Sequence, residues 1–467
     1  MKVDLIIDGG TVVTAAGVMK VAIAVEAGKI SALGSRSVLP KAEKVIQAEG
    51  KIVIPGGIDP HVHYELYQKG ETSPETWDKG TIAAAMGGTT MVIDFATQQK
   101  GKPLTEAVKQ KLSRAAELSA VDYSVHGTLT DFTDLDKMRA EMKEMIDRGI
   151  PSFKEYMCYR EEGWYADDWA LLAVFKAAQE YGGLVKVHAE NVSLIENWQQ
   201  ECLRKGWVEA KYHGVAKPNF VEAEAIQRAL SLAEFAGSKV YIAHVSTREG
   251  VELVGNTRGK GLPAYAETCP HYLTLTEDLL EAPDGFYYIC SPPLRKREDV
   301  EELWRGLADG RISVVSSDHA VFTSEQKSKH SAVFTEVPNG FPGVEIRVPI
   351  VYSEGVEKRR LSLSRFVELV SANAAKVYGV YPRKGVLAPG SDADIVIIDP
   401  KKEKTLDCDS LHMGADWSAY EGWKVTGWPT TTILRGKIIV DGEDYVGTPG
   451  EGEFVERKIE DAFIKTV

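Results

Sequence analysis

Cysteine is scarce in this sequence, and its spacing excludes two common uses of the residue. The five cysteines, Cys158, Cys202, Cys269, Cys290 and Cys408, are odd in number, and no two of them form a Cys-x-x-Cys pair. A disulfide framework would need an even set of partners, and a cysteine zinc site would need closely spaced pairs. We therefore expect reduced thiols and a cytoplasmic location.

Long hydrophobic runs are also missing. The N-terminal segment Met-Lys-Val-Asp-Leu-Ile-Ile-Asp interrupts its apolar residues with aspartates, so it does not resemble a secretory signal peptide. No segment has the roughly 20 consecutive apolar residues that a membrane-spanning helix needs. We therefore expect neither secretion nor insertion into a membrane.

Basic residues are fewer than acidic residues in this chain. The chain has 55 lysines and arginines against 68 aspartates and glutamates, which gives a formal net charge of −13. Nucleic acids and anionic membranes bind basic surfaces, so neither is an expected partner. The chain has 467 residues, of which 44% are hydrophobic and 26% charged, and it is long enough for one large globular domain and a smaller one.

The middle of the chain alternates between short β-rich segments and helical segments. The predicted strands cover residues 58–63, 89–96, 121–129, 152–157, 184–190, 239–246, 264–269 and 312–318. The predicted helices include residues 106–118, 135–147, 169–181, 223–235 and 300–307. Eight such units predict an α/β fold of the (β/α)8 TIM barrel type, with its active site at the C-terminal ends of the strands. Residues 324–330 are predicted to form a loop over that face.

The two ends of the chain differ from the middle. Short alternating strands with glycine turns are predicted at 3–14, 21–30 and 51–54, and again at 392–398 and 430–440. Strands from both ends would pair into a smaller β-sandwich domain beside the barrel. The predicted domains are a first sandwich part at 1–55, the barrel at 56–378, a second sandwich part at 379–441, and a C-terminal tail at 442–467.

Two histidines lie one residue apart in the segment Pro-Gly-Gly-Ile-Asp-Pro-His-Val-His, at the end of the first predicted barrel strand. A single histidine is more often a hydrogen-bonded core or surface residue than a ligand. Side chains two residues apart in a strand point to the same side, so His61 and His63 would face the barrel mouth together. The pair is therefore a candidate for half of a metal site.

Three further polar residues end other predicted barrel strands. His188 follows Leu-Val-Lys-Val, His244 follows Val-Tyr-Ile-Ala, and Asp318 follows Ile-Ser-Val-Val-Ser-Ser. Unrelated core histidines would not be expected to fall repeatedly at the catalytic face of a barrel. Four histidines and one aspartate suit zinc or a similar borderline divalent ion.

These ligands lack an anionic group that could bridge two metal ions, and the fourth predicted strand carries a lysine instead. Lys154 lies between Phe153 and Tyr156 in an apolar strand, which argues against a surface role. An ammonium group there would be repelled by metal cations. If carbon dioxide carboxylated the amine, the long carboxylate so formed could bridge two ions, although spacing in the sequence does not establish such a modification.

Taken together, the motifs closely resemble those of the cyclic amidohydrolases, and within them the dihydropyrimidinase and hydantoinase branch. They are Pro-Gly-Gly-Ile-Asp-Pro-His-Val-His, Phe-Lys-Glu-Tyr-Met, Val-His-Ala-Glu-Asn, His-Val-Ser and Ser-Asp-His, and the similarity covers nearly the whole chain. The resemblance implies a hydrolase with two Zn2+ ions per subunit. The implied ligands are His61, His63 and Asp318 for one ion, His188 and His244 for the other, and carboxylated Lys154 as the bridge.

The same resemblance implies the reaction. The substrate would be a cyclic ureide or imide, such as a dihydropyrimidine or a 5-substituted hydantoin, and the product an N-carbamoyl amino acid. Asp318 would act first as general base and then as general acid. Tyr159, five residues after the bridging lysine, would stabilise the oxyanion. The backbones of Ser291 and Asn339 would hydrogen-bond the substrate, and the subunits would form a homotetramer or homodimer.

Two other interpretations stay open at this point. An allantoinase would share the metal ligands and a motif like Glu-Thr-Cys-Pro-His-Tyr at 267–272, but the presence of Tyr159 argues against it. A non-enzymatic scaffold similar to the collapsin response mediator proteins would keep the fold and lose metal ligands, whereas this chain has them all. The loops expected around the exocyclic group of the substrate, at 64–67 and 163–165 together with Tyr156, leave the substrate and its stereochemistry undecided.

Overall fold

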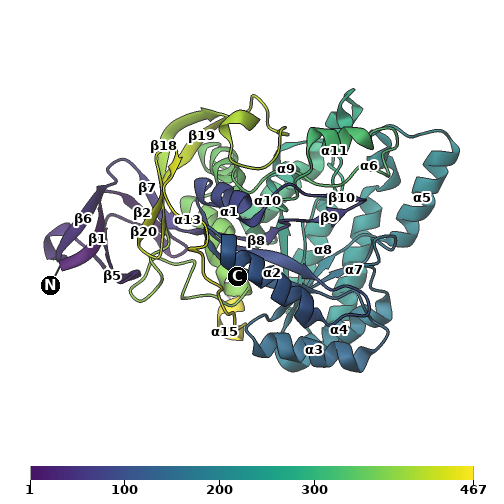
Figure 1. Cartoon of the computed structure of the whole chain (residues 1–467), viewed down its shortest axis with the longest axis horizontal. Helices are drawn as coiled ribbons and strands as arrows, with labels where there is room; N and C mark the ends of the chain where they lie inside the picture. The colour runs from purple at the N-terminus through teal and green to yellow at the C-terminus, as the bar shows by residue number, and fades with distance from the viewer. Residues whose placement is uncertain (1, 466) are drawn as a thin grey trace.

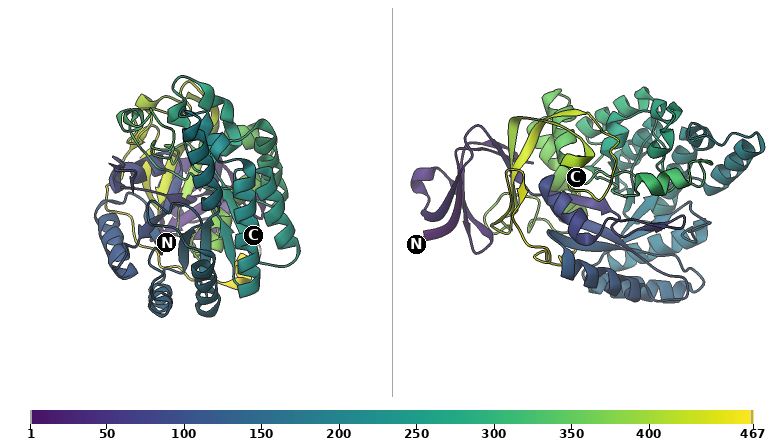
Figure 2. Two further views of the ribbon diagram at one scale, coloured as in Figure 1. Left: turned by 90° about the vertical axis from the view of Figure 1, so that its right-hand side faces the viewer. Right: turned by 45° about the horizontal axis from the view of Figure 1, so that its top comes forward.

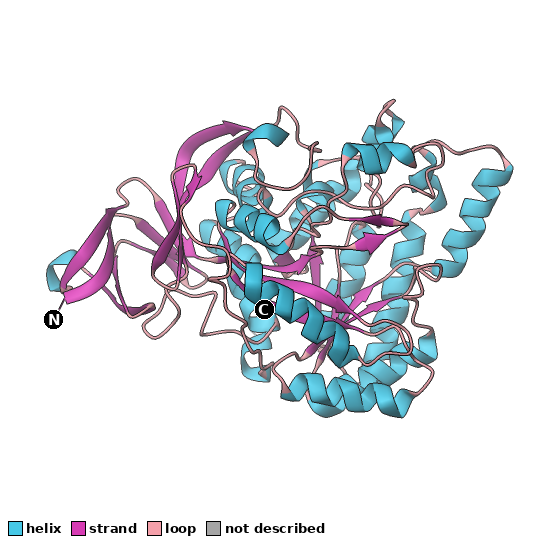
Figure 3. Cartoon of the chain, in the orientation of Figure 1, coloured by secondary structure: helices cyan, strands magenta, loops and turns pink. Residues whose placement is uncertain are grey.

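The computed structural model describes residues 2–465 and 467 and shows a barrel of strands and helices beside a pair of small β-sheets (Figure 1). Helices surround the strands of the barrel, whereas the sheets at the other end of the molecule consist mainly of strands and loops (Figure 3). The right-hand view of Figure 2 also shows the sheets projecting from one end of the barrel.

The barrel is formed by parallel strands that pair in chain order. Within the described residues its eight strands are β8 (Gly57–Val62), β11 (Thr89–Thr97), β12 (Asp122–Thr128), β13 (Ser152–Tyr156), β14 (Leu184–His188), β15 (Val240–Ile242), β16 (Ala264–Thr268) and β17 (Val314–Val315). A parallel bridge between Val62 and His319 joins the last segment to the first. The backbone N–H of His63 also donates to the carbonyl of His319 at 2.8 Å. The sheet is thus a nearly closed barrel, and the predicted fold class is confirmed.

The helices form where the sequence combines caps with an apolar stripe. In α3 (Leu135–Asp147), Asp134 caps the N-terminus, and Met138, Met142 and Met145 are buried at helical spacing. A cap of this kind stabilises a helix by about 1 kcal/mol, and the apolar stripe packs the helix on the barrel. The five helices predicted from the sequence are all present, and one of them, α3, has the predicted bounds.

The other α-helices are α1 (Trp77–Met86), α2 (Leu104–Leu118), α4 (Asp168–Tyr181), α5 (Val192–Arg204), α6 (Tyr212–Ala216), α7 (Asn219–Ala236), α8 (Arg248–Gly259), α9 (Pro270–Thr274), α10 (Arg297–Asp309), α11 (Ser324–Lys329), α12 (Arg347–Ile350), α13 (Leu363–Val367), α14 (Asn373–Val377) and α15 (Asp461–Ile464). Short 3-10 and π segments are η1 (Arg36–Val38), η2 (Glu277–Glu281), η3 (Gly285–Tyr288), η4 (Val351–Glu357), η5 (Glu368–Ala372) and η6 (Cys408–Ser410). Within the described residues, no helix is both long and apolar enough to cross a membrane.

The predicted loop at 324–330 is wrong, because residues Ser324–Lys329 form the short helix α11. Thr323 and Gln326 make a capping box at its start, in which each side chain bonds the other residue's backbone N–H. A threonine followed three residues later by glutamine is a known helix-start signal, and it was present in the sequence. Polar composition alone therefore led to the wrong prediction.

Strands from both chain ends meet beside the barrel. One sheet has the order β5-β4-β1-β6, and a second has the order β21-β20-β19-β18-β7-β2-β3. Their strands are β1 (Lys2–Asp8), β2 (Thr11–Thr14), β3 (Gly17–Met19), β4 (Ala22–Glu26), β5 (Lys29–Gly34), β6 (Lys41–Gln47), β7 (Ile52–Pro55), β18 (Ile395–Thr405), β19 (Lys424–Leu434), β20 (Lys437–Asp441) and β21 (Asp444–Tyr445). The antiparallel pairing of β18 with β7 joins the two ends. β21 pairs with β20 and so extends this sheet into the segment that was predicted as the C-terminal tail. The domain boundaries drawn from the sequence stay a prediction.

The C-terminal tail packs against the barrel of its own chain. Phe454 forms a parallel bridge with Tyr123 at the start of β12. Farther along, Arg457 is only 2% exposed, and its guanidinium donates to the side chains of Ser124 and Ser152. These residues lie near the start of the parallel strands, so the tail closes the end of the barrel opposite the predicted site.

Candidate metal centre

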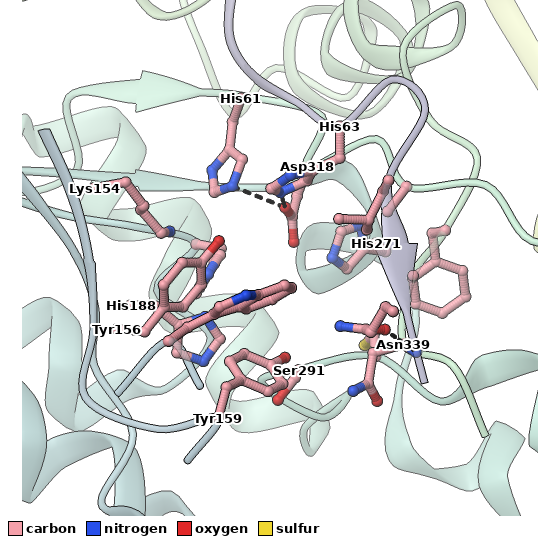
Figure 4. A pocket seen from close by; sticks show the side chains of 18 residues that line it. His61, His63, Lys154, Tyr156, Tyr159, His188, His271, Ser291, Asp318 and Asn339 are labelled. Carbon is pink, nitrogen blue, oxygen red and sulfur yellow. Dashed lines mark hydrogen bonds and ion pairs between the residues drawn. The ribbon is translucent and has the colours of Figure 1, made fainter. Parts of the chain in front are cut away.

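Every residue predicted for the site lines one pocket at the C-terminal ends of the barrel strands (Figure 4). These residues are His61, His63, Lys154, Tyr159, His188, His244, Ser291, Asp318 and Asn339. They come from different strands or from the loops that follow them, so they meet only because the parallel sheet closes into a barrel.

The first histidine pair converges on the aspartate. His61 Nε2 lies 2.9 Å from Asp318 Oδ1, and His63 Nε2 lies 3.3 Å from the same oxygen. One donor atom from each of the three residues lies within 4.8 Å of the other two. This spacing places three ligand atoms around a single point, as one divalent ion requires.

The second histidine pair lies across the pocket. The ring centroids of His188 and His244 are 4.4 Å apart, and the His244 ring is 5.4 Å from that of His61. His188 Nε2 lies 2.7 Å from Glu190 Oε2, which leaves Nδ1 as the nitrogen that can face a metal. The site therefore offers two groups of nitrogen ligands that face each other.

Lys154 extends between the two groups from β13 (Figure 4). Its side chain is completely buried, and its Nζ lacks a hydrogen-bond partner among the residues that the structure describes. The nitrogen lies over the rings of Phe95 and Tyr156, at 5.4 and 4.9 Å from their centroids. A buried, unpartnered ammonium group is costly, so the position suits a group of different chemistry.

Burial keeps three of the four site imidazoles neutral. It lowers the pKa of His63 to about 3 and that of His188 to about 4, and it also lowers the pKa of His244 well below its usual value. Neutral imidazole is the form that ligates metal ions. Burial would raise the pKa of Asp318, but its electrostatic interaction with His61 and its hydrogen bonds with His61 and His63 hold it well below its ordinary range. Asp318 is therefore a carboxylate.

Lys154 itself departs from ordinary lysine chemistry. Burial, and then the neighbouring charge of Lys186, lower its pKa to about 7. At neutral pH a substantial fraction of its side chain is thus an uncharged amine. Reaction with carbon dioxide requires that uncharged form.

Three site residues have a left-handed backbone conformation, which residues other than glycine rarely adopt. The φ angles are 59° at Tyr159, 35° at His244 and 49° at Asp318. Such conformations cost of order 1–3 kcal/mol and gather at functional sites. β15 and β17 end at Ile242 and Val315, short of the predicted limits of 246 and 318, and an extended strand could not have continued through His244 or Asp318.

The three residues predicted to bind the substrate, Tyr159, Ser291 and Asn339, line the same pocket (Figure 4). Burial raises the pKa of Tyr159 well above its usual value, so its phenol is a hydrogen-bond donor at neutral pH. Ser291 donates through Oγ to Glu190 at 2.7 Å. The backbone N–H of Asn339 donates to the side-chain oxygen of Gln68 at 2.8 Å, which leaves its carbonyl as the backbone group available to a ligand.

A second cavity of about 670 Å³ adjoins the pocket. The two share four lining residues, which are His63, Leu66, Tyr156 and Trp164. Residues 64–67, which were expected to lie around the exocyclic group of a substrate, line the second cavity. Space for a sizeable substituent thus begins beside the histidine pair.

Sequence reasoning missed the polar residues that support the ligands. Glu190 and Glu267 contact His188 and His61, although both glutamates lie in quoted motifs. Lys186 contacts Glu267 inside the barrel. Glu190 lies two residues after His188, so the spacing alone could have indicated that contact. The contacts of Glu267 with His61 and Lys186 join different strands, which only the closed sheet brings together.

One other acidic cluster is not a metal site. Asp122, Asp392 and Asp394 place oxygens within 4.8 Å of one another. Lys384 Nζ lies 2.6, 3.0 and 2.5 Å from them. The lysine thus already supplies the positive charge that the cluster needs.

Comparison with known proteins agrees with this geometry. The profile of the Amidohydrolase family matches residues 52–439. The chain is 43% identical to a D-hydantoinase of Ralstonia pickettii, over 97% of this chain and 99% of the other. It is 40% identical to a D-hydantoinase of Geobacillus stearothermophilus, over 97% and 96% of the two chains.

A solved structure of a related enzyme is also similar to this chain. The crystal structure of a dihydropyrimidinase from Brevibacillus agri matches with a TM-score of 0.94 at 37% identity, over 97% of this chain and 98% of the other. The chain therefore belongs to the amidohydrolase family, in the group that contains the hydantoinases and dihydropyrimidinases.

Proposed function

We propose that this protein is a metal-dependent hydrolase that opens cyclic ureides or imides, such as dihydropyrimidines or 5-substituted hydantoins, to N-carbamoyl amino acids. One observation carries the proposal. A single buried pocket gathers four histidines, the Asp318 carboxylate and the unpartnered Lys154 amine, in a chain related over most of its length to D-hydantoinases.

The residues fit a centre of two divalent ions, for which Zn2+ is the proposed metal. His61, His63 and Asp318 would hold one ion, and His188 and His244 the other. Lys154 fits the bridging role because its nitrogen is buried, lacks a partner within the described residues, and has a pKa lowered to about 7. Carboxylation replaces a buried cation with the anion that two metal ions need between them.

When bound, the ions would supply Lewis acidity and lower the pKa of water to about 7. The protein's own part is proton transfer and positioning. Asp318, a carboxylate at the meeting point of the histidines, would take a proton from the attacking water and deliver it to the ring nitrogen as the C–N bond breaks. The products are a carboxylic acid, which receives the OH of the water, and a ureido NH2 group, which receives its other hydrogen; at neutral pH the acid then ionises and releases a proton.

Tyr159 and two backbone positions would orient the ring. The neutral phenol of Tyr159 can donate to the carbonyl oxygen as negative charge develops on it. The carbonyl of Asn339 can accept from a ring N–H, and the backbone at Ser291 would complete the recognition. The adjoining cavity would receive the exocyclic group of a 5-substituted ring.

The test is a substrate panel of dihydrouracil, hydantoin, a 5-substituted hydantoin and allantoin, with the ring-opened product identified by mass spectrometry. We expect turnover of one or more of the first three, with an N-carbamoyl amino acid as product. Preferential hydrolysis of allantoin would instead support an allantoinase. A metal-loaded protein that opens none of the four rings would contradict the proposal.

The proposed centre predicts the metal content. Protein purified in the presence of zinc should carry close to two divalent ions per chain, because the pocket offers two facing sets of ligands and a bridge. Elemental analysis against protein concentration measures the ratio. A fully active sample with one ion or fewer per chain would contradict the two-metal centre.

We also propose a cytoplasmic homotetramer or homodimer, by resemblance to the family. Sedimentation equilibrium should give the mass of four or two chains, whereas a monomeric mass at micromolar concentration would contradict this assembly. By the same resemblance, the tail from residue 442 would help to hold the subunits together. Its contacts with its own barrel give it an additional role within the chain.

A further inference from the structure

A glutamate inside the barrel contacts one of the histidines proposed to hold the first metal ion. Glu267, on β16, is completely buried and contacts His61 Nδ1 through Oε1. Tyr241 donates its hydroxyl to the other oxygen of Glu267 at 2.9 Å. Since His61 Nδ1 is occupied by the carboxylate, Nε2 is the nitrogen that points toward Asp318 at 2.9 Å.

A buried lysine secures this glutamate. Lys186 Nζ lies 2.9 Å from Glu267 Oε1, and both side chains are completely buried. The same nitrogen donates at 2.9 Å to the carbonyl of Pro60, the residue immediately before His61. Lys186 therefore anchors the carboxylate that contacts the His61 ring and also the backbone that carries this ring.

The contacts continue downward to the tail. His126 Nε2 lies 3.0 Å from the carbonyl of Pro60, and its Nδ1 lies 2.7 Å from Ser152 Oγ. Arg457 donates to the same Ser152 oxygen at 2.8 Å. A connected column of polar groups thus runs through the barrel from the tail to the metal-facing histidine.

Such a column is unusual in a barrel interior, which is normally packed with branched apolar side chains. A buried ion pair is weak evidence for stability, because apolar residues of similar volume are often as stabilising or more so. Stability alone therefore does not account for placing Lys186 and Glu267 here. Their contacts converge on His61, and these contacts suggest a role in setting the direction of its ring.

We propose that Lys186 and Glu267 are positioning residues for the metal centre, which hold His61 so that Nε2 faces the ion. The inference rests on the proposed two-metal site. A carboxylate that accepts from the second nitrogen of a metal-bound histidine fixes the ring orientation and makes the other nitrogen a better ligand. Lys186 contacts this carboxylate and the carbonyl of Pro60, and so holds both in place.

The test compares Lys186→Met and Glu267→Gln with wild type. Zinc affinities are measured by competition with a chelator, and the absorption spectrum of the Co2+-substituted protein reports the geometry of the ligands. We expect one of the two ions to bind about 10- to 100-fold more weakly in each variant, the range typical for such supporting residues. The cobalt spectrum should change as well.

Lys384 provides a matched control. It is a buried lysine that contacts Asp122 and Asp394 at the junction of the barrel with the sheets, away from the pocket. Lys384→Met should lower the melting temperature and leave both zinc affinities and the cobalt spectrum unchanged. A change in metal binding seen equally in Lys384→Met would mean that any lost buried ion pair disturbs the site, and would overturn the proposal.

Removing Lys186 alone leaves a buried carboxylate unpaired, which destabilises the fold. The double variant Lys186→Met with Glu267→Gln avoids that unpaired charge and should still bind one ion at least about 10-fold more weakly. Wild-type affinities and spectrum in the double variant would overturn the inference and leave the proposed function intact. If wild type itself bound no zinc, the proposed metal centre would fail instead.

Discussion

Lys154→Ala should lose at least about 1,000-fold in turnover and retain one divalent ion or fewer per chain. The variant removes the bridge, so two cations would face each other without an anion between them. Losing the contribution of a metal ion costs several kcal/mol of transition-state stabilisation, and each 1.36 kcal/mol changes the rate by about tenfold. Steady-state kinetics on the best substrate of the panel and elemental analysis measure the two effects.

Chemical rescue separates a carboxylate role from a structural one. Acetate or propionate should enter the space vacated in Lys154→Ala and restore part of the metal content and of the turnover. Methylamine, which has the charge of the lost ammonium group, should restore neither, and none of these additives should stimulate wild type. A Lys154→Ala protein with two ions and wild-type turnover in the absence of any acid would remove the bridge from the mechanism.

Asp318→Asn should lower kcat by about 100- to 10,000-fold, the range for loss of a general acid–base group. The amide cannot accept the proton of the attacking water or return it to the ring nitrogen. Its oxygen can still act as a weak ligand, so loss of rate should exceed loss of metal once zinc is supplied in excess. Kinetics at saturating zinc, together with the metal content of the same samples, separate these contributions.

Retention of wild-type kcat by Asp318→Asn in the presence of two ions would show that another group moves the proton. His271 is the residue to examine in that event, because it lines the same pocket and is buried. A His271→Asn variant therefore serves as the companion measurement. In our mechanism its kcat should stay close to wild type.

The barrel could be predicted because its strands are apolar and rich in β-branched residues, and because they alternate with helices. The starts of β11, β13, β14 and β16 agree with the prediction from that pattern. The ends were harder to place. At His244 and Asp318 the backbone turns to φ angles of 35° and 49°, and hydrophobic patterning carries no information about such turns.

The histidines and Asp318 predicted to face the metal were visible in the sequence because they lie near or just beyond the C-terminal end of a strand, and Lys154, in the middle of β13, was noticed because its neighbours are apolar. The groups behind them were not. Lys186 lies in an apolar strand, and only the closure of the sheet brings it to Glu267 and to the carbonyl of Pro60. The position of the tail could not be predicted for the same reason. Arg457 contacts β12 and β13, whose residues are far from it in the chain.

The central claim is a two-metal centre bridged by a carboxylated lysine. Anomalous diffraction at the zinc edge, on crystals grown with zinc and bicarbonate, tests it most directly. We predict two peaks per chain in this pocket, one beside His61 and His63 and one beside His188 and His244, with electron density continuing from Lys154 Nζ to a group between them. A single peak, or two peaks beside an unmodified Lys154, would contradict the account.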